Sequence, residues 1–115
     1  MTLPIRTLNG DFAVTGQLVP QDLQEVASLG FATVINNRPD GEGGADQPSS
    51  RQLEQAARAA GLHYLHLPVV GGAITPEQVS EMRQALAAGR GRPILAFCRS
   101  GARSTKLFEL VQAAG

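Results

Sequence analysis

The sequence predicts an α/β fold, a three-layer sandwich in which helices cover both faces of a mostly parallel central sheet. Short apolar runs rich in β-branched residues alternate along the chain with stretches whose apolar residues recur at helical spacing. Capping residues, prolines and glycines mark the ends of the helical stretches. Because 115 residues leave no room for a second core, we expect residues 1–115 to form a single domain.

The first part of the chain predicts a strand, a helix and a second strand. Residues 11–16 alternate apolar and polar side chains, as a strand does. Pro20 suits the first turn of a helix, and Gly30 would end that helix. Residues 31–35 are almost wholly apolar, which is typical of strands covered on both faces. We therefore expect this second strand at the centre of the sheet.

A long loop and a second helix should follow. Residues 36–47 are polar and rich in glycine, and a loop of this length inside a compact domain is usually functional or disordered. Ser49 and Gln52 have the spacing of a capping box and open a helix that ends at Gly61. The expected buried residues of this helix are Leu53, Ala56, Ala57 and Ala60.

The rest of the chain predicts two further strands and two further helices. Residues 62–70 should form a third core strand, and Thr75 should cap a helix that ends near Gly89. Residues 94–97 should form the last strand and residues 104–114 the last helix. The expected buried residues of the two helices are Val79, Met82, Leu86, Leu107, Leu110, Val111 and Ala114.

This order of elements predicts where a ligand binds. In a parallel sheet the carboxyl ends of all strands lie along one edge, and ligands bind at that edge. The loop that starts at Asn36, the loop of residues 70–73 and the loop at Cys98 should therefore meet in space.

The composition excludes several classes of function. Ten acidic and ten basic residues give a net charge of zero, so we expect neither a nucleic acid nor a membrane as partner. The single cysteine, and the absence of a signal peptide or a long apolar run, predict a cytoplasmic protein. His63 and His66 lack further ligands at metal spacing, so we predict no metal and no other cofactor. The sequence does not indicate an oligomeric state.

The residues around Cys98 have the layout of an anion-binding loop with a nucleophile at its start. The apolar strand stops at this cysteine, and small and basic residues lead into the last helix. Amides at the start of a helix attract an oxyanion and favour the thiolate form of a nearby cysteine. The alternative interpretation is that Cys98 is buried and serves as a small apolar side chain. The candidate anion-binding residues are Arg99, Ser100, Gly101, Ala102 and Arg103.

Three residues of this region have more specific candidate roles. Arg103 is placed to grip two oxygens of an oxyanion, unless it is an ordinary surface arginine. Arg99 would help to select an anionic substrate if its side chain points outward. Ser104 either donates a hydrogen bond to the sulfur of Cys98 or caps the helix.

The long loop adds candidates at the same edge of the sheet. Arg38 would extend the anion-binding set. A carboxylic acid from this loop, Asp40 or Glu42, could protonate a leaving group, and Asp40 is our candidate acid. Asp40 and Gly41 also form an ordinary turn sequence, which is the simpler reading of this pair.

Three segments together resemble the phosphatase-like domain of the beta-lactamase hydrolase-like family. They are residues 98–104, 33–42 and 62–70, and the resemblance extends from Asp11 to the last helix. It implies a fold like that of the tyrosine and dual-specificity phosphatases. It also implies Cys98 as the nucleophile, a phosphate-binding loop that ends at Arg103, and an anionic substrate such as a phosphate monoester, cleaved through a phosphocysteine intermediate.

The same comparison leaves two alternatives open. Only four residues separate Cys98 from Arg103, a loop size that resembles that of the single-domain rhodaneses. A sulfurtransferase that carries sulfur as a persulfide on Cys98 is therefore the alternative enzyme. Phe97 stands where the tyrosine phosphatases have histidine, and residues 70–73 contain no carboxylate. A non-catalytic anion-binding module linked to sulfide metabolism is the third possibility.

Overall fold

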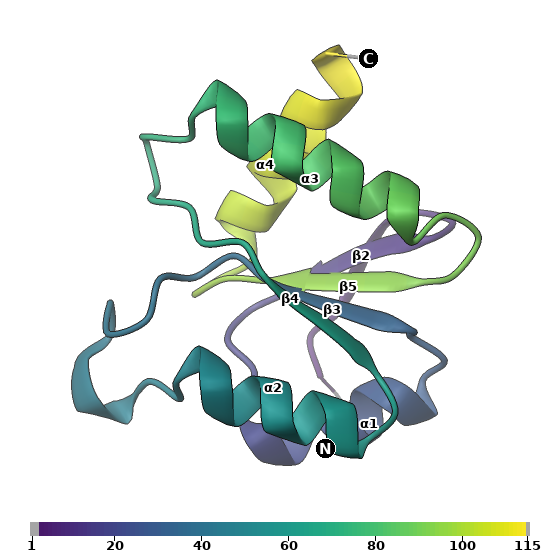
Figure 1. Cartoon of the computed structure of the whole chain (residues 1–115), viewed down its shortest axis with the longest axis vertical. Coiled ribbons are helices and arrows are strands. Elements are labelled where there is room, and N and C mark those ends of the chain that lie inside the picture. The colour runs from purple at the N-terminus through teal and green to yellow at the C-terminus, as the bar shows by residue number, and fades with distance from the viewer. Residues whose placement is uncertain (1–2, 115) are drawn as a thin grey trace.

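The computed structural model describes residues 3–114 and consists of one five-stranded sheet with helices on both faces (Figure 1). Residues 1, 2 and 115, which the domain prediction includes, lie outside the described residues. The strands are β1 Arg6–Asn9, β2 Phe12–Thr15, β3 Thr33–Asn36, β4 His63–His66 and β5 Ile94–Phe97. The helices are α1 Leu23–Ser28, α2 Ser50–Ala59, α3 Pro76–Ala88 and α4 Ala102–Ala114, with short 3-10 turns at Pro20–Asp22 and Gly44–Asp46.

The sheet has the strand order β1-β2-β5-β3-β4, and only β1 runs antiparallel to its neighbour. Helices α1 and α2 cover one face, and α3 and α4 cover the other (Figure 1). Along β5 the side chains alternate between the two cores, since Ile94 packs with α3 and α4 whereas Leu95 packs with α1 and α2. The predicted α/β sandwich with a mostly parallel sheet is confirmed.

Both capping boxes predicted from the sequence form. Ser49 Oγ accepts a hydrogen bond from the amide of Gln52 at 3.1 Å, and Gln52 Oε1 accepts one from the amide of Ser49 at 3.0 Å. Thr75 and Gln78 exchange the same two bonds at 3.2 and 2.9 Å. These bonds satisfy amides that have no partner within the helix, and so they fix where α2 and α3 begin.

Three strand predictions need correction. Strand β1 was not expected, and it forms because Arg6–Asn9 pairs with β2 as an antiparallel hairpin. The strand of residues 33–36 is interior, but β5 occupies the centre of the sheet. The segment of residues 62–70 contributes buried side chains to the core, but its strand is shorter than predicted. It covers residues 63–66 and lies at the edge of the sheet, where Leu65 is 40% exposed.

The last helix begins two residues earlier than predicted and buries a different face. It starts at Ala102, directly after the loop that follows β5. Leu107 and Val111 are buried as expected, but Phe108 is buried in place of Ala114. The ring of Phe108 stacks on that of Phe12, with centroids 4.4 Å apart, so this side of the helix faces the sheet.

The carboxyl ends of β3, β4 and β5 point to the same end of the molecule, and the loops after them project together there (Figure 1). The prediction that these loops meet is confirmed by the cavity described below. No helix within residues 3–114 combines the length and the apolar character that crossing a membrane requires.

Candidate active site

An open cavity of about 650 Å³ lies where the three loops meet. Its walls come from the loop after β3, the loop after β4 and the start of the segment after β5. Charged residues and glycines supply most of its surface, and Val70 is its only larger apolar side chain. The lining residues are Arg38, Glu42, Gly43, Val70, Gly71, Arg99 and Arg103.

Cys98 lies directly after β5 and is 1% exposed, beneath the loop that separates it from α4. The amide of Gly101 donates a hydrogen bond to its Sγ at 3.1 Å. Burial raises the pKa of the thiol, but the amides of Ser104, Ser100, Arg103 and Gly101 outweigh that effect and lower it. A reacting group therefore has to enter this ring of amides to reach the sulfur.

The loop keeps its shape because it packs against the end of β2. Gly101 has a φ of +93°, and a Cβ there would lie 3.3 Å from the carbonyl oxygen of Thr15. The carbonyl of Arg99 accepts a hydrogen bond from the amide of Gln17 at 3.2 Å. A Cβ on Gly16 would lie 3.1 Å from that same carbonyl oxygen. Glycine at two positions thus allows the close approach that makes the amides converge.

Arg103 is fixed by two acceptors that come from the other two loops. Its Nη1 and Nη2 donate to the two carboxylate oxygens of Glu42, both at 2.7 Å, and Nη1 also donates to the carbonyl of Val69 at 3.0 Å. A guanidinium has five N–H donors, so these bonds leave the Nε–H and one Nη2 hydrogen without an oxygen acceptor among the described residues, on a side chain that also interacts with the sulfur of Cys98. Those two donors form a second fork, which is the arrangement that binds an oxyanion bidentately.

The electrostatics of the site centre on Glu42. Hydrogen bonds from Arg103 and then from Arg38 lower the pKa of this carboxyl to about 2. The pKa of the Arg103 guanidinium is raised, first by Glu42 and to a smaller extent by Cys98. Glu42 is therefore a carboxylate at neutral pH, and it acts as an anchor for the two arginines rather than as a proton donor.

Arg38 is the second arginine of this network. Its Nε donates to Glu42 at 2.8 Å and its Nη1 donates to Gln17 Oε1 at 2.9 Å. A Cβ on Gly43 would lie 2.8 Å from Arg38 Nη2, so a larger residue there would force the guanidinium to shift. Nε2 of His66 lies 2.9 Å from the carbonyl oxygen of Arg38. This contact joins β4 to the loop after β3.

Asn37 joins the elements that carry the site, although sequence reasoning gave it no role. Its amide donates to the carbonyl of Phe97 at 2.8 Å, and its side chain donates to the carbonyl of Leu67 at 2.9 Å. Its Oδ1 accepts a hydrogen bond from Ser104 Oγ at 2.8 Å. The two consecutive asparagines that end an apolar strand were the available signal, because a buried amide there needs several partners.

The side chains of Ser104 and Asp40 differ from their predicted placements. The hydroxyl of Ser104 donates to Asn37, so it neither donates to the Cys98 sulfur nor caps a helix; the contact to the sulfur comes from the Ser104 amide. Asp40 Oδ1 accepts a hydrogen bond from the amide of Ser50 at 2.7 Å, at the start of α2. This contact turns Asp40 away from the cavity, which argues against its role as the acid.

The remaining candidates lie along the loop. Arg99 lines the cavity and is exposed. Ser100 is exposed and its Oγ accepts a weak hydrogen bond from the amide of Ala102 at 3.4 Å. Among residues 3–114, no three side chains of the types that bind metals in proteins lie together. The cavity thus offers amides and arginines, which suit an oxyanion.

Comparison with known proteins gives a consistent result. Residues 4–115 match the family described as beta-lactamase hydrolase-like protein, phosphatase-like domain. A beta-lactamase hydrolase-like protein from Agrobacterium fabrum is 36% identical over 106 residues, which are 92% of this chain and 24% of that protein. The chain thus spans about a quarter of the length of the curated relatives it matches.

Solved structures support the same relationship. A protein from Neisseria meningitidis Z2491, described as a candidate phosphatase, is 34% identical with a TM-score of 0.81, over 94% of this chain and 75% of that one. Tk-PTP in its active form is 22% identical with a TM-score of 0.67, over 94% of this chain and 80% of that one. The second likeness concerns the fold alone, which is that of the tyrosine phosphatases.

Proposed function

The chain belongs to the family of phosphatase-like domains of beta-lactamase hydrolase-like proteins, and from this premise we propose that it is a cysteine-dependent phosphatase. The proposed substrate is a phosphate monoester, and the reaction passes through a phosphocysteine. One observation carries the proposal. The N–H donors of Arg103 that Glu42 does not use, and the amides of the loop after Cys98, lie around the only thiol of the chain.

In the first step the thiolate of Cys98 attacks phosphorus. A bond forms between Sγ and phosphorus, and the bond from phosphorus to the ester oxygen breaks, with its electron pair going to the leaving group. The loop amides and the Arg103 fork hold the other phosphoryl oxygens and stabilise the charge that they carry in the transition state. Glu42 and the Val69 carbonyl keep the guanidinium in place, so no reorientation is needed during the reaction.

In the second step water attacks the phosphocysteine and inorganic phosphate leaves, which returns Cys98 as a thiolate. Neither of the two candidate acids, Asp40 and Glu42, is suited to protonate the leaving group in the first step. Glu42 is ionised because its pKa is about 2, and Asp40 is bound to the start of α2. We therefore expect activity toward aryl phosphates, whose leaving groups need little protonation, and much weaker activity toward alkyl phosphates.

The test compares the purified protein with Cys98→Ser, using an aryl phosphate such as 4-nitrophenyl phosphate. We expect release of phosphate by the parent protein and only background release by the variant, because the hydroxyl is a far weaker nucleophile than the thiolate. A series of aryl phosphates with progressively poorer leaving groups should then show steeply falling rates. Equal phosphate release by Cys98→Ser and the parent protein would rule out the cysteine mechanism.

A second candidate function is sulfur transfer, which the short loop between Cys98 and Arg103 favours. Here the thiolate attacks the sulfane sulfur of thiosulfate, sulfite leaves with the electron pair, and a persulfide remains on Cys98. Cyanide then removes the outer sulfur as thiocyanate and returns the thiolate. Thiocyanate formation from thiosulfate and cyanide, without phosphate release from the aryl phosphate, would favour this function over the first.

A further inference from the structure

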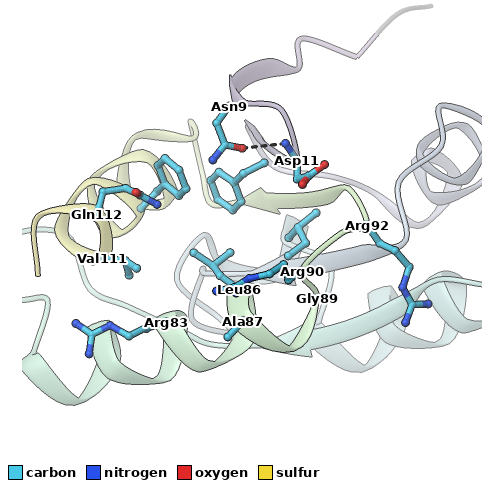
Figure 2. Close-up of a pocket in the computed structure, with 13 residues that line it drawn as sticks. Asn9, Asp11, Arg83, Leu86, Ala87, Gly89, Arg90, Arg92, Val111 and Gln112 are labelled. Carbon is cyan, nitrogen blue, oxygen red and sulfur yellow. Dashed lines mark hydrogen bonds between the residues drawn. The ribbon is translucent and has the colours of Figure 1, made fainter. Parts of the chain in front are cut away.

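A second cavity, of about 410 Å³, lies at the opposite edge of the sheet (Figure 2). It is bounded by the turn between β1 and β2, the last turns of α3, the segment that enters β5, and α4. None of its lining residues belongs to the cavity at Cys98. An inference drawn from it therefore stands independently of the proposed function.

Positive charge is concentrated around this cleft. Three arginines line it, and Asp11 is its only acidic residue. In Figure 2, Arg83 and Arg92 lie toward opposite ends of the cleft and Arg90 lies between them. None of the three guanidinium groups forms a hydrogen bond or an ion pair with another side chain among residues 3–114. In a chain of zero net charge, the cleft thus carries more positive than negative charge, and its arginines have no acidic partner among residues 3–114.

Two uncharged side chains add further donors. The side-chain oxygen of Asn9 accepts a hydrogen bond from the amide of Asp11 at 2.9 Å, drawn as the dashed line in Figure 2. This bond fixes the amide of Asn9 and leaves its NH₂ group without a protein partner among the described residues. Gln112 contributes a second exposed amide from α4. The rim of the cleft thus offers mostly N–H groups, which bind oxygen acceptors.

The interior of the cleft is apolar. Phe12 and Phe108 stack with an interplanar angle of 6° and, with Leu86 and Ile94, form its inner wall. Gly89 brings α3 close to the sheet, since a Cβ there would lie 2.8 Å from Ile94 Cδ1. A cavity of this size lies within the range of about 300–1,000 Å³ that is typical of small-molecule sites.

The dipole of helix α3 does not explain the positions of all the N–H donors around the cleft. Positive charge is stabilised within the last turn of a helix, which would explain Arg90 and Arg92 just after α3 ends. Arg83 lies more than a turn before that end, and Asn9 and Gln112 belong to other elements. Helix stability alone therefore does not explain why these side chains surround one cleft, and a ligand bound between them would.

We propose that this cleft is a second anion-binding site, which takes an organic anion with a carboxylate or phosphate-type group attached to an apolar body. The anionic group binds at the guanidinium of Arg90, which lies between the other two arginines. The apolar body lies mainly against Leu86, which is partly exposed, and touches only the small exposed part of the two stacked rings, so that it displaces water from hydrophobic surface.

The test uses the full chain labelled with ¹⁵N and two probes, 2-naphthoate and 2-naphthylphosphonate, followed by amide chemical shifts. Neutral 2-naphthylmethanol is the matched probe without charge. We expect saturable shifts at Phe12, Gly89 and Ile94 with at least one of the two anions. The tighter of the two identifies the preferred anionic group, and the neutral probe should bind at least about tenfold more weakly.

Two variants separate the cleft from general electrostatics. Arg90→Ala should weaken binding of the better anion about tenfold, whereas Arg51→Ala, an exposed arginine on α2 across the sheet, should leave it unchanged. Both residues are exposed, so both variants should fold. The proposal fails if no shift saturates, if the neutral probe binds equally well, or if the shifts are confined to the Cys98–Arg103 loop. It also fails if both variants lose binding equally.

Discussion

The arginines at the two ends of β5 are held in opposite ways. At the carboxyl end, Arg103 and Arg38 share the carboxylate of Glu42, with contacts of 2.7 and 2.8 Å. At the other end, the three arginines of the second cleft form no ion pair with any residue between 3 and 114. Two arginines of the first cavity are therefore held by a shared carboxylate, whereas the three of the second cleft have no ion-pair partner among the described residues.

This difference matches what each region has to do. A group that stabilises charge in a transition state must be in position before the reaction begins, because reorientation during the reaction costs rate. A group that only binds a ligand can adjust to it and loses some side-chain entropy as it does so. A shared carboxylate such as Glu42 thus distinguishes an arginine suited to catalysis from one suited to binding alone.

The sharpest test of this contrast is to remove one arginine from each region. Arg103→Ala should lower kcat for an aryl phosphate by about 10²–10³-fold, which is the usual cost of losing one donor to a developing oxyanion. Arg90→Ala should change kcat by no more than about twofold, because it lies at the far edge of the sheet. Steady-state kinetics on both variants measures the difference. Equal losses would show that the two regions do not differ in the way we infer.

The next test keeps Arg103 and removes the charge that holds it. Glu42→Gln should lower kcat/KM by about 10–100-fold, because a misplaced guanidinium loses much of its contribution. Vanadate binding should weaken in parallel. Asp40→Asn is the matched control, since Asp40 lies in the same loop but contacts α2. If Glu42→Gln leaves both kinetics and vanadate affinity unchanged, Glu42 does not position Arg103.

Sequence reasoning succeeded where the determinants are local. The capping boxes at Ser49 and Thr75 involve residues three apart, and both form. The layout around Cys98 is also local, because the amides that surround its sulfur come from the next six residues. Patterns confined to a short segment carry enough information to predict such features.

Sequence reasoning failed where partners are distant. Glu42 and Arg103 are 61 residues apart, so nothing in either segment reveals that they pair. The same applies to the position of β4, because an apolar segment does not reveal whether a strand will have one neighbour or two. The glycine-rich sequence of the long loop does not indicate whether Asp40 or Glu42 faces the cavity. The folded structure shows that Glu42 bonds to Arg103 and that Asp40 bonds to α2.

A smaller effect should come from the hydrogen bond that links α4 to the end of β3. Ser104→Ala leaves the buried Oδ1 of Asn37 without its donor and should cost about 1–3 kcal/mol of unfolding free energy. Ser100→Ala, at an exposed position in the same loop, should cost less than about 0.5 kcal/mol. Urea denaturation measures both. Equal stabilities would mean that this bond does not help to hold the site together.

The smallest expected effect is the dependence of stability on acid. The pKa of Glu42 falls from 4.5 to about 2 on folding, so its carboxylate stabilises the folded state above pH 4.5 and loses that contribution as the pH falls toward 2. Because its side chain is 31% exposed, we expect about 1 kcal/mol or less. The stability difference between the parent and Glu42→Gln should therefore shrink between pH 5 and pH 2, measured by urea denaturation at each pH. A difference that stays constant over this range would mean that Arg103 and Arg38 do not stabilise the carboxylate form of Glu42. The arginines of the first cavity would then be held no more firmly than those of the second cleft.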